Sequence, residues 1–211
     1  MLTRHTRNVS AALVSILLLA TVATPAGAVD EDDAAAYCSG QGGNVVDLVP
    51  YLAAGTDSQV ELGGSLKVCQ FITQEGDNPV QVVVDLTTLH SEHPTLAGLA
   101  YLAMVPSSNS GSPGSNPASS YCPDDLGGTE AFGTQATGAW VGALDPGMEA
   151  GYSEPLGNTI NLCVFADRSA IDDFALFYHS TGETRGTDLA EVMRYQADDA
   201  TPAVFDAGAD R

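Results

Sequence analysis

The chain carries one short pattern twice, and this internal repeat limits the folds open to it. In the first copy a tyrosine precedes Cys38, two adjacent glycines follow shortly after, and an apolar-Cys-x-Phe segment surrounds Cys69. In the second copy the same features surround Cys122 and Cys163. Because the shared features are unevenly spaced, composition alone does not explain them. We interpret the two copies as a duplication.

The duplication predicts an α+β fold of two small tandem repeats. Each repeat is expected to be a short helix packed on a small antiparallel sheet and held by one disulfide. A run of Ser, Gly, Pro and Asn without apolar residues separates the copies and predicts a linker. The predicted boundaries are a signal peptide at 1–28, repeat one at 29–105, a linker at 106–114, repeat two at 115–197 and an acidic tail at 198–211.

The first 28 residues have the features of a secretory signal. Arg4 and Arg7 precede an apolar run at 11–20, and small residues end the segment at Ala28. This arrangement predicts cleavage after Ala28 and a secreted protein, either extracellular or periplasmic. No second long apolar run follows, so we expect no membrane span after cleavage.

The charge of the chain is strongly acidic. Seven Lys and Arg oppose 27 Asp and Glu, and removing Arg4 and Arg7 with the signal leaves 5 minus 27, or −22. Such a surface repels phosphate, which argues against nucleic acid and anionic membranes as partners. Two interpretations stay open, namely simple solubility in salty surroundings and attraction of a basic partner or of divalent cations.

Four cysteines in an exported chain predict two disulfides. Each repeat has one early and one late cysteine, and an ancestral single repeat could close only its own pair. The duplication therefore predicts the pairs Cys38–Cys69 and Cys122–Cys163. A metal or redox site at the cysteines is disfavoured, because the sequence has no Cys-x-x-Cys spacing and no pair of histidines near the cysteines.

The local patterns predict helices and strands in the same order in both repeats. Helices are expected from near Asp33 to Gly42 and from Asn116–Pro117 to Gly127, each ended by glycine. Alternation in the first late-cysteine strand places Cys69 and Phe71 on one face, towards a helix. The predicted strands are 44–51, 65–72, 130–134 and 159–165.

Beyond these strands the two repeats differ. Ser169 is expected to cap a helix that contains Ile171, Phe174, Ala175 and Tyr178, with Asp172 near its start. Residues 80–90 are compatible with either helix or strand. Short helices are expected at 96–101 and 189–195.

The second repeat resembles the small haemolysin-type domain of exported bacterial proteins. The resemblance covers roughly residues 115–180, and rests on Asn-Pro-Ala-Ser before Cys122, on Gly127-Gly128 and on Cys-Val-Phe-Ala-Asp-Arg-Ser at 163–169. The family also has a third and a fourth cysteine, whose positions fall on Ile171 and near Thr181 here. Their joint absence implies that those two pair with each other, which leaves Cys122 for Cys163. The family has no established activity, and the first repeat looks like a more diverged copy.

The sequence offers no recognisable catalytic motif. His90 and His93, three residues apart, could share a helical face as metal ligands, but they stand in a predicted turn and are expected to be solvent-exposed. The serines near His90 and His179 lack a supporting hydrolase motif. The acid pairs at 124–125 and 172–173 are expected to be solvated, because adjacent residues on a helix point in different directions. We therefore expect no catalytic residue, no cofactor and no enzyme activity.

Calcium is the one ligand suggested by the sequence. Asp167, Ser169 and Asp173 bring hard oxygen atoms into a short stretch, although capping of a helix start explains these residues more simply. The loop at 134–158 is longer than its counterpart in repeat one, and it carries the sole tryptophan, Trp140. It is the expected specificity loop, with a core position as the alternative for Trp140.

The sequence thus predicts a secreted, non-enzymatic binding protein. Its partner is expected to be an extracellular protein or a small ligand, and a basic one would suit the charge. Inhibition of a basic secreted hydrolase is one alternative, since acidic loops would meet a cationic cleft. A hydrolase with an unrecognised site is the other.

Overall fold

The computed structural model describes residues 29–53, 57–108, 117–131, 139–142 and 159–196, which form helices and strands in similar amounts. The α+β class is therefore confirmed. The first half contains α1 (Glu31–Gly40), β1 (Asn44–Leu52), β2 (Val60–Glu61), β3 (Leu66–Glu75), β4 (Asn78–Asp85), α2 (Leu86–His90) and α3 (Leu96–Ala103). The second half contains α4 (Pro117–Asp125), β5 (Thr129–Ala131), β6 (Ala139–Gly142), β7 (Thr159–Ile160), β8 (Leu162–Val164), β9 (Ala170–Asp172), α5 (Asp173–Ser180) and α6 (Leu189–Val192). The predicted signal peptide, most of the predicted linker and the predicted tail lie outside the described residues.

Helix ends follow the local sequence closely. The side chain of Asp30 accepts hydrogen bonds from the N–H groups of Asp32 and Asp33, which starts α1 two residues before the predicted position. Pro117 opens α4, where its missing N–H costs nothing. After α4, Gly127 has a φ of 68°, a left-handed conformation that glycine adopts without strain.

Strands from both halves join in one antiparallel sheet, in contrast to the two small sheets predicted. β1 pairs with β6, and β4 meets β9 through Val84 opposite Ile171. The sheet order is β5-β8-β9-β4-β3-β1-β6-β7, with β2 added to β1. The physical reason is that the sheet of either half alone would end in two unpaired edges, and the pairing of β1 with β6 and of β4 with β9 covers part of these edges.

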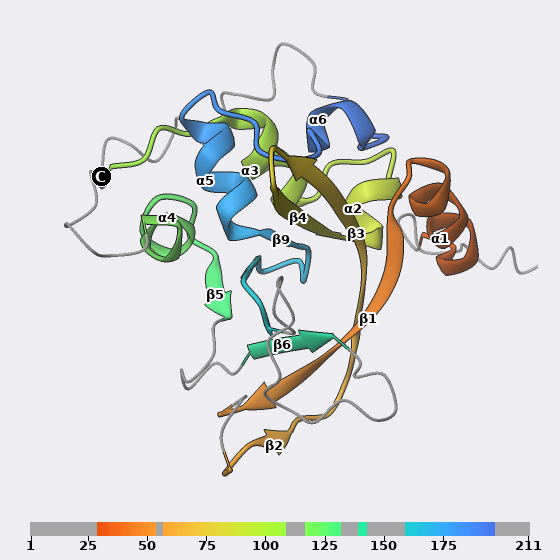
Figure 1. Cartoon of the computed structure of the whole chain (residues 1–211), viewed down its shortest axis with the longest axis vertical. Coiled ribbons are helices and arrows are strands. Elements are labelled where there is room, and N and C mark those ends of the chain that lie inside the picture. Colours follow the sequence, from red (N-terminus) through yellow and green to blue (C-terminus); the bar gives the residue numbers. More distant parts are fainter. Residues whose placement is uncertain (1–28, 54–56, 109–116, 132–138, 143–158, 197–211) are drawn as a thin grey trace, which may run out of the picture.

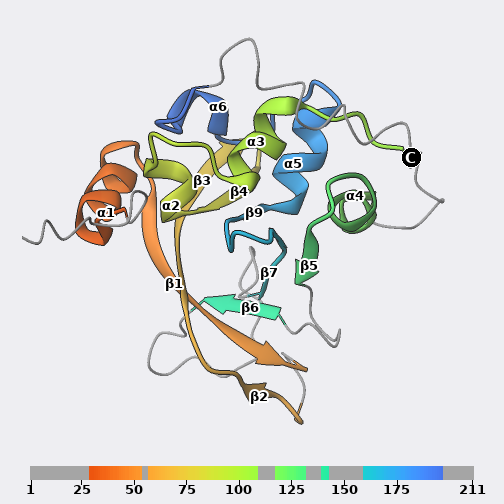
Figure 2. The ribbon, with the colours of Figure 1, turned by 180° about the vertical axis from the view of Figure 1, so that it is seen from behind.

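This sheet curves back on itself. β7 and β8 are separated only by Asn161, so the strands at 159–164 connect the β6 side of the sheet to the β9 side. β5 and β6 follow each other along the same edge of that segment. The strands therefore form a closed ring, and the helices gather over one part of its outer face (Figures 1 and 2).

Side-chain alternation along the strands produces two cores. The inner core fills the ring and consists of Leu48, Val68, Val83, Ile160, Leu162 and Ala170. The outer core lies under the helices and includes both disulfides, with Phe71, Val84 and Ile171 among the strand residues. Cys69 and Phe71 thus share the helix-facing side of β3, as the alternation predicts.

Both predicted disulfides are confirmed. Cys38 of α1 is bonded to Cys69 of β3, and Cys122 of α4 is bonded to Cys163 of β8. All four cysteines are buried. Each bridge ties a helix to the strand beneath it, and neither crosses between the halves.

Three predicted elements differ from the structure. Residues 80–90 divide into strand β4 and helix α2, so each of the two interpretations held for one part. Ser169 does not cap α5, because Ile171 pairs with Val84 and the strand continues to Asp172, which becomes the cap. The helix expected at 189–195 is confined to Leu189–Val192.

Candidate functional site: a groove beside strand β4

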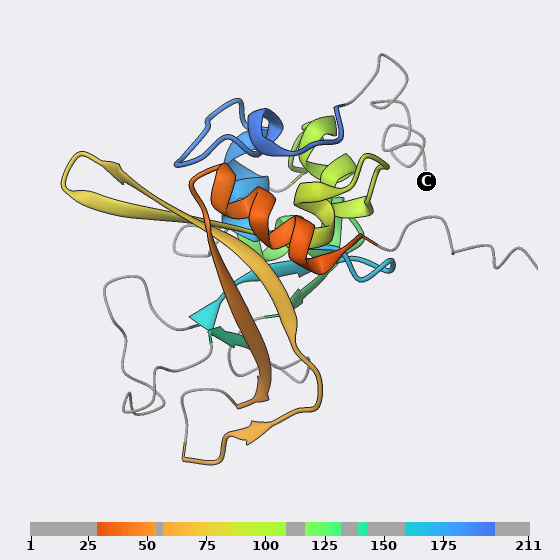
Figure 3. The ribbon, with the colours of Figure 1, turned by 90° about the vertical axis from the view of Figure 1, so that its right-hand side faces the viewer.

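Strand β4 has an edge that the rest of the sheet leaves partly open. It pairs with β3 along its whole length, from Asn78 opposite Glu75 to Asp85 opposite Val68. On its other side the only paired position is Val84, because β9 is just three residues long. No strand among the described residues pairs with the second edge at 78–82, and Figure 3 shows this hairpin projecting from the body of the molecule.

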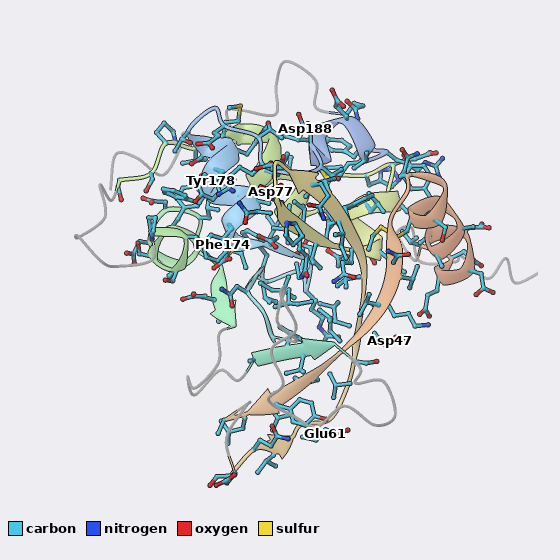
Figure 4. All side chains as sticks on the ribbon, viewed as in Figure 1. Asp47, Glu61, Asp77, Phe174, Tyr178 and Asp188 are labelled. Atoms are coloured by element: carbon cyan, nitrogen blue, oxygen red, sulfur yellow. A yellow bond between two sulfur atoms is a disulfide. The ribbon has the colours of Figure 1, made fainter. Side chains whose placement is uncertain are left out.

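A groove of about 270 Å³ lies between this edge and α5. Phe174 is 37% exposed although it is a large apolar residue, and Tyr178 follows one turn later. Figure 4 labels Phe174 and Tyr178, whose side chains extend from α5. The groove is lined by Pro79, Val80, Gln81, Val82, Asp172, Phe174, Ala175, Tyr178 and Arg185.

Arg185 lines the groove and contacts both the hairpin and the helix. Its Nε donates to Glu75 at 3.3 Å, and its guanidinium lies 5.0 Å from the centre of the Tyr178 ring. The N–H of Gly186 also donates to Glu75, at 2.6 Å. A Cβ at Gly186 would come within 3.0 Å of Val80 and Val82, so only glycine lets the segment pass this closely. These contacts hold residues 185–186 against the hairpin beside the groove.

Two adjacent acids stand beside the groove with different environments. Burial raises the pKa of Asp172 to about 7, opposed by the N–H of Ala175, which donates to its side chain at 2.9 Å. Burial, with the nearby charges of Asp172 and Glu130, raises the pKa of Asp173 to about 8. Asp173 is fully buried, and neither of its carboxyl oxygens has a hydrogen-bond partner among the described residues. The side chain of Asp172 caps α5, and burial raises the pKa of both acids above that of an exposed aspartate.

The positive charges of the described residues are largely neutralised within the molecule. Lys67 is paired with Glu31, Arg185 with Glu75 and Arg194 with Glu92. Arg168 is the remaining Lys or Arg in the described ranges. Acidic side chains far outnumber these cations among the described residues, so the excess negative charge can attract an approaching positive charge.

The calcium candidates are used within the fold. Oδ2 of Asp167 accepts from the N–H of Leu96 at 2.8 Å, and Oγ of Ser169 accepts from the N–H of Ala97 at 2.9 Å. These two residues thus cap α3 from the second half of the chain, while Asp173 lies buried in α5. No group of three or more His, Cys, Asp or Glu suited to a metal occurs among the residues the structure describes.

The predicted turn histidines occupy separate environments. His90 ends α2, where its Nε2 is 2.8 Å from Nη1 of Arg194 and its ring meets the edge of Tyr37. It is half-buried, not fully exposed as predicted, because this packing covers it. His93 is exposed, and His179 is stacked on Tyr101 at 3.9 Å. Burial lowers the pKa of His179.

Trp140 lies in β6 opposite Ile160, half-buried and packed against the inner core. This position corresponds to the core alternative for this residue. The remainder of the predicted specificity loop, 134–138 and 143–158, lies outside the described residues.

Sequence reasoning missed the groove and the role of Asp85. Oδ2 of this buried side chain accepts from the N–H of Ala170 at 2.8 Å, which links the two halves, while Oδ1 accepts from the N–H of Thr88. A signal was present, since Asp85 and Asp172 each follow a β-branched strand residue and precede an apolar helical stretch. No sequence signal marks the groove, because its walls come from β4 and from a helix about 90 residues later.

Comparison with protein-family models, with curated proteins and with solved structures finds no match to this chain. Within the described ranges, no helix has the length and apolar character needed to cross a bilayer.

Proposed function

We propose that this is a secreted, non-enzymatic binding protein that takes its partner into the groove between β4 and α5. The observation that carries this proposal is the groove itself, which is lined both by the partly exposed Phe174 and by residues 79–82 of the open strand edge. Exposed aromatic residues beside a polar rim are typical of binding sites. The net charge of −20 favours a basic partner.

Catalysis is less well supported by the same residues. Asp173 is fully buried, so it has no exposed atom with which to reach a substrate. Asp172 lines the groove, but its side chain caps α5. Acid–base catalysis needs a group within hydrogen-bond reach of the substrate, and the groove walls otherwise offer aromatic, aliphatic and amide side chains.

The test is a selection of random heptapeptides by the chain at 29–211, followed by calorimetric titration of the selected peptides. We expect enrichment of Lys and Arg, and about tenfold weaker binding to Phe174→Ala. The matched control is Leu62→Ala, because Leu62 is also 37% exposed but lies outside the groove lining. Equal binding to the wild type, Phe174→Ala and Leu62→Ala would exclude the groove as the binding site.

Two further assays separate the alternative functions. Inhibition of a basic hydrolase such as lysozyme, lost in Phe174→Ala, would identify the protein as an inhibitor. Turnover of any member of a panel of glycans and peptides would instead contradict the non-enzymatic assignment.

We also propose that the two halves are copies of one ancestral haemolysin-type unit. The supporting observation is an identical strand register around the late cysteines. Cys69 lies opposite Val45 and Val84, and Cys163 lies opposite Glu130 and Ile171, which are the corresponding positions. Each half also runs in the order helix, strands, helix. Export through the segment at 1–28 is part of the same proposal, and the two disulfides are typical of exported proteins.

A further inference from the structure

We propose that the groove binds an extended segment of a basic protein as an added antiparallel strand on β4. This inference rests on the proposed function and deepens it, because it states how the partner is held. Strand addition uses main-chain hydrogen bonds for affinity and pockets beside the edge for specificity.

The hairpin register identifies which groups of β4 face outward. Glu75 and Asn78 flank the two-residue turn, so the N–H and C=O groups of Asn78 point to β3. The direction of the main-chain groups alternates along a strand. Those of Val80 and Val82 therefore also point to β3, whereas those of Pro79 and Gln81 point to the open edge. The edge therefore offers the C=O of Pro79 and both main-chain groups of Gln81.

Gln81 is the centre of this edge. A peptide residue opposite it would exchange two main-chain hydrogen bonds with it, as in any hydrogen-bonded antiparallel pair. Its side-chain Oε1 is buried and has no hydrogen-bond partner among the described residues. Pro79 has no N–H, so it cannot donate a main-chain hydrogen bond to an added strand. The hydrogen-bond ladder is therefore limited at the hairpin end of β4.

The side chains of an added strand would lie on the same faces of the sheet as the β4 side chains opposite them. Residues opposite Val80 and Val82 would lie on the helix side, against Phe174 and Tyr178. Residues opposite Pro79 and Gln81 would point to the other face, where Ile72, the β3 partner of Gln81, is 46% exposed, so long charged side chains there can reach solvent. The groove thus fits an alternating apolar and basic segment, and the acidic excess of the chain supplies the attraction for its cations.

The experiment uses the chain at 29–211 and a labelled peptide, acetyl-Lys-Val-Lys-Val-Lys-amide, in a fluorescence anisotropy titration. Two derivatives carry N-methyl groups, one on the central lysine and the other on both valines. Methylation of the central lysine removes the N–H that would meet Gln81, so we expect at least about tenfold weaker binding. Methylation of the valines alters N–H groups that face away from β4, so we expect affinity within about twofold of the parent.

A variant tests the edge from the side of the protein. Gln81→Pro removes the N–H at the open edge and should weaken binding about tenfold, while proline is tolerated at edge positions. Phe174→Ala should also weaken binding and leaves the backbone unchanged, so the test does not depend on the folding of Gln81→Pro. A peptide with Glu in place of Lys should bind at least about tenfold more weakly at low salt.

Equal effects of the two methylation patterns would overturn strand addition. If Phe174→Ala still weakened binding in that case, the groove would remain the binding site and the proposed function would stand. No binding of the parent peptide would also overturn the inference. Binding that is unaffected by Phe174→Ala would contradict both proposals.

Discussion

Asp173→Asn should make the protein more stable in mild alkali and flatten the dependence of its stability on pH. The wild-type carboxyl is fully buried, and both of its oxygens lack partners among the described residues. Burial and two neighbouring acids raise the pKa from 3.8 to about 8. The native state therefore keeps a proton that the unfolded chain has already released.

The sign and size of the effect follow from this difference. Between the two pKa values the native state binds more protons than the unfolded state, so the free energy of unfolding falls as pH rises. Each unit of pKa difference corresponds to 1.36 kcal/mol, which gives an upper limit of about 6 kcal/mol once Asp173 is fully ionised. Because Asp172 shares the interaction and water can enter, we expect about 3 kcal/mol of loss between about pH 5 and about pH 9.

The measurement is urea unfolding at both pH values, followed by circular dichroism with the disulfides intact. Asp173→Asn keeps the size of the side chain and removes its charge, so its stability relative to wild type should rise by about 3 kcal/mol from the lower pH to the higher pH. Asp77→Asn is the control, since Asp77 is exposed. Parallel pH profiles for wild type and Asp173→Asn would refute the reasoning.

Substitutions at three further places test the packing. Replacing Cys38 and Cys69 by serine should lower the free energy of unfolding by about 4 kcal/mol, because the bridge closes a separation of 31 residues, and an equal stability under reducing and oxidising urea titration would contradict this. Gly43→Ala should destabilise by about 1–3 kcal/mol in thermal melts, since its Cβ would lie 2.3 Å from Sγ of Cys69, whereas Gly40→Ala meets no atom within 4 Å and should be harmless. Asp85→Ala should cost about 2–4 kcal/mol, because it strands the buried N–H of Ala170, and Asp85→Asn should recover part of that loss; equal urea midpoints for the two variants would argue against the link between halves.

The sequence was sufficient for local features and for the cysteine pairs. The faces of β3 follow from alternation around Cys69, and the pairing follows from one early and one late cysteine in each half. The start of α5 was misplaced because Ile171 fits helical spacing equally well. What decides its state is the contact with Val84, which is distant in sequence.

The joint sheet and the groove could not be predicted for a related reason. The sequence pattern of one strand does not show whether that strand lies at an edge of the sheet. Only the pairing between the two halves decides which edges are covered. The groove then arises from a difference in length, since β4 has eight residues and β9 has three. Helical spacing did place Phe174 and Tyr178 on the same helix, but the strand opposite them lies in the other half.

The two disulfides close two separate covalent loops that follow one another along the chain. A protease that cut the chain anywhere between the loops, in the stretch from 109 to 116, would leave halves held together by strand pairing and core contacts alone. Denaturant without reductant would then release two fragments, each still cyclised through its own sulfur atoms.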